Sequence, residues 1–344
     1  MTVSVRARLD ELKARMRLPV IAAPMFLVSG PDLVLAACDA GIMAALPGPN
    51  GRTIDDLAGW FSRIDAHFAA ARAGGRAPAP WAFNMITHSS YHRFDAELDL
   101  VARHRPELVV TALGGPQRVT ETVHAYGGLV FADINAPAYA RKAIDKGADG
   151  LVLVCSGAGG HTGEYAMLAF IDEVRSFFDG PIAVGGAIGH GRAVRAVELL
   201  GADFAYLGTR FIPATESLVS DGYRAMLQAA RMEDLVASRA ITGALGNWLR
   251  PSLEAAGIDP AALKAEAKLD FSGDMHANAK AWKHVWSAGH GVGAIKAAEP
   301  VAAIVDRLVA EYLAAIDAER HMTAFARRNG WRPAPVRAPA GEGA

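Results

Sequence analysis

Short runs of consecutive apolar residues recur along the first part of the chain, and each is followed by a stretch with helical periodicity. Consecutive rather than alternating apolar positions are typical of strands that are covered on both faces, as in a parallel sheet. The predicted strands are Pro19–Ala23, Ile42–Leu46, Trp81–Ile86, Leu108–Ala112, Leu129–Ile134, Gly150–Val154, Ile182–Gly185 and Phe204–Leu207. The predicted helices between them include Asp32–Asp39, Ile54–Ala73, Ala136–Lys146, Ala169–Phe178 and Arg192–Leu200.

This alternation predicts an α/β fold of the (β/α)8 TIM-barrel type, because eight strand-then-helix units over about 210 residues match that architecture. The alternative is a doubly wound sheet, which usually carries a G-x-G-x-x-G fingerprint directly after its first strand. Here the first strand runs into Ala22-Ala23-Pro24-Met25, without that fingerprint. The pattern therefore favours the barrel.

The rhythm changes after residue 213, where we expect helices at Thr215–Arg231 and Asp259–Lys268 and no further strand. A final helix over Ala298–Ala315 is expected to pack back against the barrel. Three tryptophans of this region are expected to pack the appendage rather than to stack on a cofactor: Trp248, Trp282 and Trp286. The predicted organisation is a barrel over residues 1–215, a helical appendage near the active-site face over 216–330, and a flexible tail over 331–344.

Composition narrows the classes of partner. Of 344 residues, 51% are hydrophobic and 21% are charged, which is typical of a globular protein. The 35 basic and 36 acidic residues give a net charge of −1, so we expect neither a nucleic acid nor a membrane as partner. Two cysteines exclude a disulfide framework. With a charged start and no long apolar segment, the sequence predicts a soluble, cytoplasmic protein.

In this fold the active site lies at the carboxyl ends of the strands. Gly185 and Gly186 end the seventh predicted strand, and Gly208 and Thr209 follow the eighth. Bare backbone there lets peptide N–H groups approach an anion, with the dipole of the next helix adding to the attraction. Loops after strands seven and eight form the recurrent phosphate site of TIM barrels. Although glycines can also serve tight turns, their joint occurrence predicts a phosphorylated ligand.

The loop over 156–163, which follows the sixth strand, contains four glycines and one histidine. We expect a flexible rim in which His161 alone offers strong acid/base capacity. An imidazole with an ordinary pKa near 6.5 can donate or accept a proton at neutral pH. Most of the 11 histidines must be surface residues, but the position of His161 at the functional end of a strand favours a catalytic role.

Other candidates are weaker. His88 and His92 could share a helix face as metal ligands, but no carboxylate or cysteine stands at a convincing spacing, so we predict no metal site. Cys155 lacks a specific activating base, and a small, half-buried thiol is the simpler interpretation. Asn84 is either a hydrogen-bonding group for a ligand or a turn residue.

Together these elements resemble the nitronate monooxygenase family of flavin-dependent barrels, formerly called 2-nitropropane dioxygenases. The resemblance covers about residues 15–215, with a weaker echo over 286–291. It rests on the combination of these segments: Ala22-Ala23-Pro24-Met25, Asn84, Gly157-Ala158-Gly159-Gly160-His161-Thr162-Gly163, Gly185-Gly186 and Gly208-Thr209-Arg210-Phe211.

The resemblance implies FMN as cofactor. It further implies roles along the flavin: Ala23, Pro24 and Met25 along the isoalloxazine edge, Asn84 hydrogen-bonding the flavin, Gly159 and Gly160 passing close to it, and Gly185, Gly186, Gly208 and Thr209 holding the phosphate. His161 would face the ring and deprotonate a nitroalkane, or receive its nitronate. Oxygen would complete the conversion to a carbonyl compound and nitrite.

One residue departs from the family pattern, because many relatives carry a lysine where this chain has Asp133. A carboxylate beside the flavin would reverse the local charge and disfavour an anionic flavin. Relatives with the same barrel use NAD(P)H to reduce quinones or enoyl thioesters, and the sequence keeps this alternative open. A non-enzymatic flavin-binding module is a third hypothesis, against which the glycine–histidine loop argues.

Overall fold

The computed structural model describes residues 4–263 and 285–328, and its centre is a closed barrel of parallel strands in the order β1-β2-β3-β4-β5-β6-β8-β9. This confirms the predicted (β/α)8 fold. The barrel strands are β1 (Val20–Ala22), β2 (Met43–Pro47), β3 (Trp81–Ile86), β4 (Leu108–Ala112), β5 (Leu129–Ile134), β6 (Gly150–Val154), β8 (Ile182–Gly185) and β9 (Phe204–Leu207). The last six have the predicted bounds.

Pairing between the first and last strands closes the barrel, with Ile21 of β1 opposite Met43 of β2 on one side and Tyr206 of β9 on the other. The lumen below the active-site end is filled with apolar side chains, among them Phe131 and Phe204. Helix α1 (Val5–Lys13) adds the buried side chains of Leu9 and Leu12 to the same cluster. The amino-terminal end of the barrel is therefore closed, which leaves the carboxyl end for a ligand.

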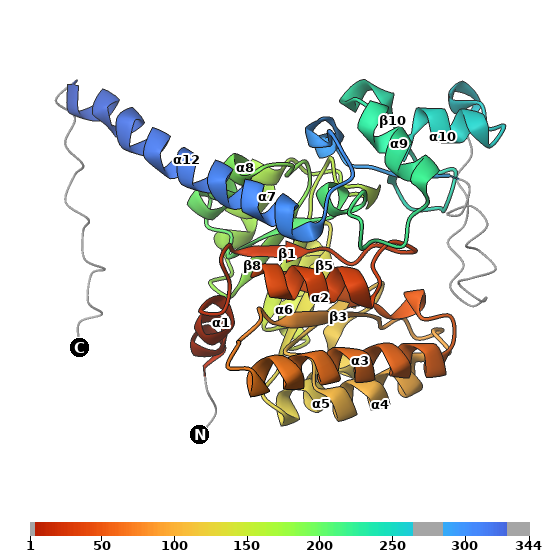
Figure 1. Ribbon diagram of the computed structural model, residues 1–344, viewed down its shortest axis with the longest axis vertical. Coiled ribbons are helices and arrows are strands. Elements are labelled where there is room, and N and C mark those ends of the chain that lie inside the picture. The colour runs from red at the N-terminus through yellow and green to blue at the C-terminus, as the bar shows by residue number, and fades with distance from the viewer. Residues whose placement is uncertain (1–3, 264–284, 329–344) are drawn as a thin grey trace.

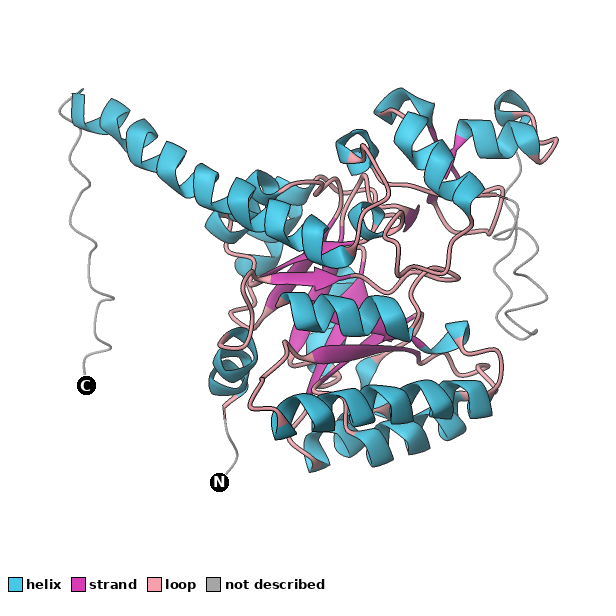
Figure 2. Ribbon diagram, in the orientation of Figure 1, coloured by secondary structure: helices cyan, strands magenta, loops and turns pink. Residues whose placement is uncertain are grey.

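The helices surround the strands, as Figure 2 shows in cyan and magenta. After α1 they are α2 (Pro31–Ala40), α3 (Ile54–Ala73), α4 (Phe94–His104), α5 (Thr120–Ala125), α6 (Pro137–Asp145), α7 (Met167–Arg175), α8 (Gly191–Leu199), α9 (Asp221–Ala229), α10 (Arg250–Ala255) and α12 (Val301–Arg328). The long helix α12 packs against α2 and α8, with Val301, Ile304 and Leu308 buried. Of the helices described, none is both long and apolar enough to span a membrane.

The segment after the barrel contains two strands that the sequence did not predict. β10 (Leu235–Ser238) and β11 (Gly246–Leu249) pair antiparallel, and β11 also pairs with β7 (Gly160–His161). The expectation of no further strand is therefore wrong. Strands this short, containing glycine, asparagine and serine, leave no run of apolar residues to detect.

The predicted helices of this segment are shorter than expected. The helix predicted over Thr215–Arg231 begins only at Asp221, where the hydroxyl of Ser220 accepts a hydrogen bond from the N–H of Tyr223. Of the helix predicted over Asp259–Lys268, the described part holds a single 3-10 turn, Pro260–Ala262. Trp282 and the tail over 331–344 lie outside the described residues.

Candidate active site

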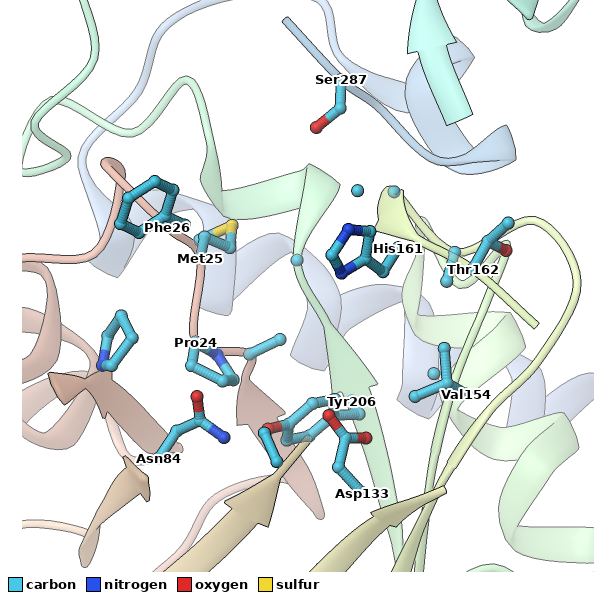
Figure 3. A pocket seen from close by; sticks show the side chains of 18 of the residues that line it. Pro24, Met25, Phe26, Asn84, Asp133, Val154, His161, Thr162, Tyr206 and Ser287 are labelled. Carbon is cyan, nitrogen blue, oxygen red and sulfur yellow. The ribbon is translucent and has the colours of Figure 1, made fainter. Parts of the chain in front are cut away.

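A cavity of about 1040 Å³ opens at the carboxyl ends of the barrel strands. Its wall includes every residue that the sequence singled out as catalytic or cofactor-binding: Ala23, Pro24, Met25, Asn84, Gly159, Gly160, His161, Gly185, Gly186, Gly208 and Thr209. These residues come from five separate segments of the chain, and the barrel brings them into one place. Figure 3 shows part of this wall, with His161 across the cavity from Asn84, Asp133 and Tyr206.

The glycine pairs after β8 and β9 form one end of the cavity, but they are glycines for different reasons. Gly186 has φ +138°, a conformation that other residues rarely adopt, and an added Cβ would lie 2.9 Å from the Ser156 carbonyl oxygen. Gly208 has φ −98°, and an added Cβ would make only ordinary contacts, the nearest at 3.6 Å to Met25 Sδ. Protein packing therefore does not require glycine at 208, whereas an anion close to the backbone would.

Thr209 contributes a hydroxyl at the same end. Its Oγ1 accepts a hydrogen bond of 2.8 Å from the Gly289 N–H, so its own proton can still be donated to an anion. The neighbouring Arg210 is buried and directed toward Glu299, 3.6 Å away, outside the cavity wall. This end of the cavity thus presents backbone and a hydroxyl rather than a cationic side chain.

The helix-dipole part of the phosphate prediction needs correction. The first N–H of α8, at Gly191, donates to Glu311 Oε2 of α12 at 2.7 Å. After β9 the chain forms only a 3-10 turn, Thr209–Phe211. The N-terminus of α8 is therefore already paired with a carboxylate, and the cavity at this end is lined by the loop over 185–188 and by the turn after β9.

Asn50, which the sequence analysis missed, holds the loop after β1. Its Oδ1 accepts from the Leu27 N–H at 2.9 Å, and its Nδ2 donates to the carbonyl oxygens of Met25 and Ser29. The side chain is buried, with 7% exposure. Because Asn50 uses both ends of its amide on one loop, it fixes the path of Met25 along the cavity. No local motif marks such a residue.

Three polar side chains lie at the floor of the cavity, at the ends of β3, β5 and β9 (Figure 3). Asn84 Nδ2 donates to the Val110 carbonyl oxygen at 3.2 Å. Asp133 Oδ1 and the Tyr206 hydroxyl are buried and have no hydrogen-bond partner. Burial raises the pKa of Asp133 to about 7, and burial together with Asp133 raises the pKa of Tyr206. Unpaired buried polar atoms are costly, so this floor is shaped for a polar ligand.

His161 is held by a segment far away in the sequence. Strand β7, which contains it, pairs with β11, so that His161 lies opposite Gly246. The His161 Nε2 atom lies 3.0 Å from Thr242 Oγ1. Asn247 Nδ2 donates to the Ala158 carbonyl oxygen at 2.7 Å, and the His290 N–H donates to the Gly157 carbonyl oxygen. The glycine-rich loop is therefore tied on several sides, and the expectation of a flexible rim is wrong.

The environment of His161 favours the neutral imidazole. Its side chain is exposed to the cavity and is otherwise surrounded by protein, and this desolvation lowers its pKa. A neutral imidazole at neutral pH can accept a proton from a carbon acid in the cavity. The geometry thus suits a general base.

The glycine loop is also packed backbone to backbone against a late segment. A Cβ on Gly159 would lie 2.7 Å from the Gly289 nitrogen, and a Cβ on Gly289 would lie 2.6 Å from the Gly157 carbonyl oxygen. In the sequence, this late segment matched the family pattern only weakly, over residues 286–291. Ser287, Gly289 and Gly291 line the cavity as well, so residues from beyond the barrel complete its wall.

The weaker sequence candidates have other roles. Cys155 is fully buried rather than half-buried, and burial raises the pKa of its thiol to about 12, which excludes a reactive thiolate. His88 Nδ1 lies 2.7 Å from Ser90 Oγ, and within residues 4–263 and 285–328 no three His, Cys, Asp or Glu side chains converge as metal ligands would.

The tryptophans take two different positions. Trp248 is fully buried in a small cluster of the appendage, as expected. Trp286 lies on the cavity wall, where its ring stacks on Tyr223 with ring centroids 4.9 Å apart. Trp248 therefore packs the appendage, whereas Trp286 also shapes the wall of the cavity.

A TIM barrel with an acid/base residue facing a glycine-lined cavity at its carboxyl end is an arrangement typical of barrel enzymes, and the comparisons with known proteins identify the family. The family model described as Nitronate monooxygenase matches residues 9–311. The chain belongs to the nitronate monooxygenase family.

Individual relatives are distant. The chain is 27% identical over 242 residues to the (3aS,4S,5R,7aS)-5-hydroxy-7a-methyl-1-oxo-octahydro-1H-indene-4-carboxyl-CoA dehydrogenase of Rhodococcus jostii, covering 70% of this chain and 64% of that protein, a little under two thirds of its length. It is 27% identical to a nitronate monooxygenase of Paraburkholderia phytofirmans, covering 70% of this chain and 76% of that protein. The solved nitroalkane oxidase of Streptomyces ansochromogenes has the same fold, with a TM-score of 0.74 at 24% identity over 89% of this chain and 99% of that one.

Proposed function

We propose that this protein is an FMN-dependent enzyme that uses O2 to oxidise alkyl nitronates, or nitroalkanes, to carbonyl compounds and nitrite. Membership of the family supports the reaction class, and the cavity supplies a place for both flavin and substrate. When bound, FMN would supply the redox chemistry between the substrate and oxygen. The protein contributes positioning, polar surroundings and proton handling.

FMN is supported by the end of the cavity that Gly185, Gly186, Gly208 and Thr209 form. At Gly208 no side chain separates the backbone from the cavity, and the Thr209 hydroxyl can donate a hydrogen bond. Both features suit a terminal phosphate. We assign these four residues to the phosphate. A Cβ on Gly208 would make only ordinary contacts, so packing alone does not require glycine there. A cofactor close to the backbone would require it, and this observation carries the proposal.

The flavin ring would lie between the barrel floor and the glycine loop. Ala23, Pro24 and Met25 would follow its edge, and the Asn84 amide would hydrogen-bond it. Gly159 and Gly160 would pass close to it from the other side. The unpaired Asp133 carboxyl faces the same space and offers the polar ring atoms a further partner.

His161 carries the proposed chemistry. It faces the cavity opposite the floor, it is fixed by β11 and Thr242, and its lowered pKa keeps the imidazole neutral. With a nitroalkane as substrate, His161 would take the proton from the carbon next to the nitro group. With a nitronate already formed, no proton has to be removed, and the N–H of the neutral imidazole would orient the anion by a hydrogen bond.

The test has two stages. The absorption spectrum of the purified protein, with and without added FMN, shows first whether flavin binds. Oxygen uptake with ethylnitronate or propionate 3-nitronate is then measured on the loaded protein. We expect flavin bands and oxygen consumption with nitrite release. A loaded protein that fails to turn over either compound, where a known relative does, would overturn the nitronate assignment.

A second candidate keeps FMN but takes electrons from NAD(P)H and passes them to a quinone or an enoyl thioester. The observation in its favour is the size of the cavity, which exceeds the need of a small nitronate. The name of the Rhodococcus jostii relative, a carboxyl-CoA dehydrogenase, also fits a thioester. Rapid anaerobic bleaching of the flavin by NADH or NADPH would favour this candidate, whereas a flavin that stays oxidised would favour the nitronate.

A further inference from the structure

In the described part of the chain, four residues other than glycine have a positive φ: Leu27 (+60°), Arg105 (+52°), Leu113 (+57°) and Ala187 (+57°). A Cβ makes this left-handed conformation costly, so it persists only where the surroundings impose it. All but Arg105 line the cavity, in loops that follow the barrel strands β1, β4 and β8. Backbone strain of this kind tends to gather at functional sites, so each of the three calls for a reason.

Leu113 combines the strained backbone with a large side chain that the protein does not cover. Its side chain lines the cavity and is 37% exposed. Leu27, by comparison, is half-buried and Ala187 carries only a methyl group. Among the strained residues of the cavity wall, Leu113 therefore offers the largest exposed apolar surface.

The backbone on both sides of Leu113 is fixed by the loop after β3. The Thr87 N–H donates to the Ala112 carbonyl oxygen at 3.0 Å. A Cβ on Gly114 would lie 2.5 Å from the Thr87 carbonyl oxygen, so the two main chains are in direct contact there. Leu113 lies between these two contacts, and the chain has to turn within this single residue.

The fold explains the turn but does not explain why leucine stands at it. Glycine would adopt the same φ without strain, and asparagine would tolerate it. Because the Leu113 side chain is exposed, its burial contributes little to stability. An exposed leucine is ordinary on an outer surface, but here it lies on a cavity wall in a conformation that leucine disfavours. A contact with a ligand would account for the side chain.

The cavity wall around Leu113 is suited to hydrocarbon. Ile86 of β3 lies opposite Ala112 of β4 in the sheet, directly before Leu113. Apart from Asn84, the lining residues from the ends of β2, β3 and β4 and the loops after them are apolar or glycine: Pro47, Pro49, Ile86, Ala112, Leu113, Gly114, Gly115 and Pro116. The polar groups that suit a reacting head, among them His161, lie on other parts of the wall.

We propose that Leu113 is a specificity-determining residue whose side chain contacts the alkyl chain of the substrate, and that the preferred substrate has a chain longer than that of ethylnitronate. The proposal rests on the site described under Proposed function, in which His161 handles the reacting carbon. Discrimination by chain length is then located in the loop after β4 and is separate from proton transfer.

Titration calorimetry on the flavin-loaded protein measures this contact without turnover, with acetate, butanoate and hexanoate as separate ligands. Each carboxylate has the planar two-oxygen head of a nitronate but lacks the nitro group that turnover requires. We expect the dissociation constant to fall along the series, by about fourfold for each methylene that reaches the apolar wall. Leu113→Ala should remove most of this gain for hexanoate and leave acetate binding unchanged.

A second variant separates the contact from the strain. Leu113→Gly removes the same isobutyl group, so it should weaken hexanoate binding as much as Leu113→Ala does. Only glycine also relieves the positive φ, so Leu113→Gly should raise the Tm by about 1–3 °C, whereas Leu113→Ala should not. Hexanoate binding that differs between the two variants would mean that the loop conformation sets the specificity, and would overturn the proposal.

Two matched controls lie outside the cavity wall. Arg105→Gly relieves a similar φ at the end of α4, so it should raise the Tm without changing hexanoate binding. Leu200→Ala truncates a leucine that is also 37% exposed, and it should leave hexanoate binding unchanged. A loss of hexanoate binding in either control as large as that in Leu113→Ala would contradict a specific contact.

The remaining outcomes separate this proposal from the proposed function. Equal binding of acetate and hexanoate by the unsubstituted protein, or a loss of FMN affinity in Leu113→Ala, would overturn the role of Leu113 alone. A loaded protein that binds hexanoate through Leu113 but consumes no oxygen with nitronates contradicts the nitronate assignment alone. A protein that takes up no flavin contradicts both.

Discussion

Two aspartates lie at opposite ends of the same barrel and are held in opposite ways. Asp203, at the closed end, is bonded to Arg6, Lys13 and Arg175 and accepts from the Ile182 N–H at 3.0 Å. Burial alone would raise its pKa, but these partners outweigh burial and lower it.

At the open end, Asp133 has an oxygen without a partner, and its pKa is raised to about 7. At the closed end the Asp203 carboxylate is satisfied by protein groups and stabilises the fold, whereas at the open end the Asp133 oxygen is available to a ligand. Asp203, directly before β9, is thus a structural residue, whereas Asp133 lines the cavity.

The largest expected difference is in kcat, between a variant of His161 at the open end and a variant of His124 away from the cavity. His161→Ala should keep the flavin but lose at least about a hundredfold in kcat, the usual scale for a lost general acid/base. His124, which pairs with Asp149 away from the cavity, is the control, and His124→Ala should leave kcat unchanged. Steady-state oxygen uptake measures kcat, and the absorption spectrum measures the flavin content of each variant. Equal losses in the two variants would contradict a special role of the open end.

Substitution of the two cavity glycines should separate ligand space from backbone strain. Gly208→Val should fold with unchanged thermal stability before flavin is added, yet remain colourless after loading and desalting, because its branched side chain fills the phosphate space. Gly186→Val should also load poorly, and it should cost about 1–3 kcal/mol of unfolding free energy because of its φ of +138°. A yellow Gly208→Val protein would refute the phosphate placement.

At the closed end, Asp203→Asn should reduce the free energy of unfolding by about 2–3 kcal/mol, since a buried carboxylate with cationic partners is replaced by a neutral amide. Because the folded pKa of Asp203 lies below the unfolded value, its contribution is present above that value and is lost as the pH falls through the folded pKa. Urea unfolding at pH 7 and at pH 3.5 checks this: the two proteins should differ at the first pH and converge toward the second.

At the open end, replacing the aspartate is expected to stabilise the protein rather than destabilise it. The folded pKa of Asp133, about 7, lies above its ordinary value of 3.8, so ionisation costs the folded state nothing below pH 3.8 and the full penalty above pH 7. Asp133→Asn should therefore raise the Tm of the flavin-free protein at pH 8 by about 2 °C or more, with a smaller gain at pH 5. A lower Tm at pH 8 would show that the carboxylate has a partner after all.

The smallest expected effect is on the pH dependence of the reaction. Because burial lowers the pKa of His161, kcat/KM for a nitroalkane should decline on the acid side only below the ordinary imidazole value of 6.5. The profile is measured with a neutral nitroalkane, whose own ionisation is slow and lies well above this range. An acid limb centred above 6.5 would mean that the imidazole is stabilised as a cation.

The sequence revealed the parts of the molecule that depend on local pattern. Six strands, among them Leu129–Ile134 and Phe204–Leu207, were predicted at their observed bounds because doubly buried strands are runs of adjacent apolar residues. The cavity residues were found because the barrel fixes which strand ends converge.

What the sequence could not reveal depends on contacts between distant segments. Asn50 forms hydrogen bonds with the loop after β1, and Gly289 lies close to Gly159. Neither contact produces a recognisable pattern in the neighbouring sequence. The same holds for the pairing of His161 with Gly246, which joins residues far apart in the chain. Unpaired atoms such as Asp133 Oδ1 are recognised only when every neighbour is known.

The tie between β7 and β11 has a consequence for how the enzyme becomes competent during synthesis. Ribosomes extend the chain from its amino end, so all eight barrel strands emerge before residues 246–249 exist. Until that later stretch arrives, the imidazole has neither its neighbouring strand nor the Thr242 hydroxyl. A nascent barrel would thus complete its cylinder first and acquire a fixed proton acceptor last.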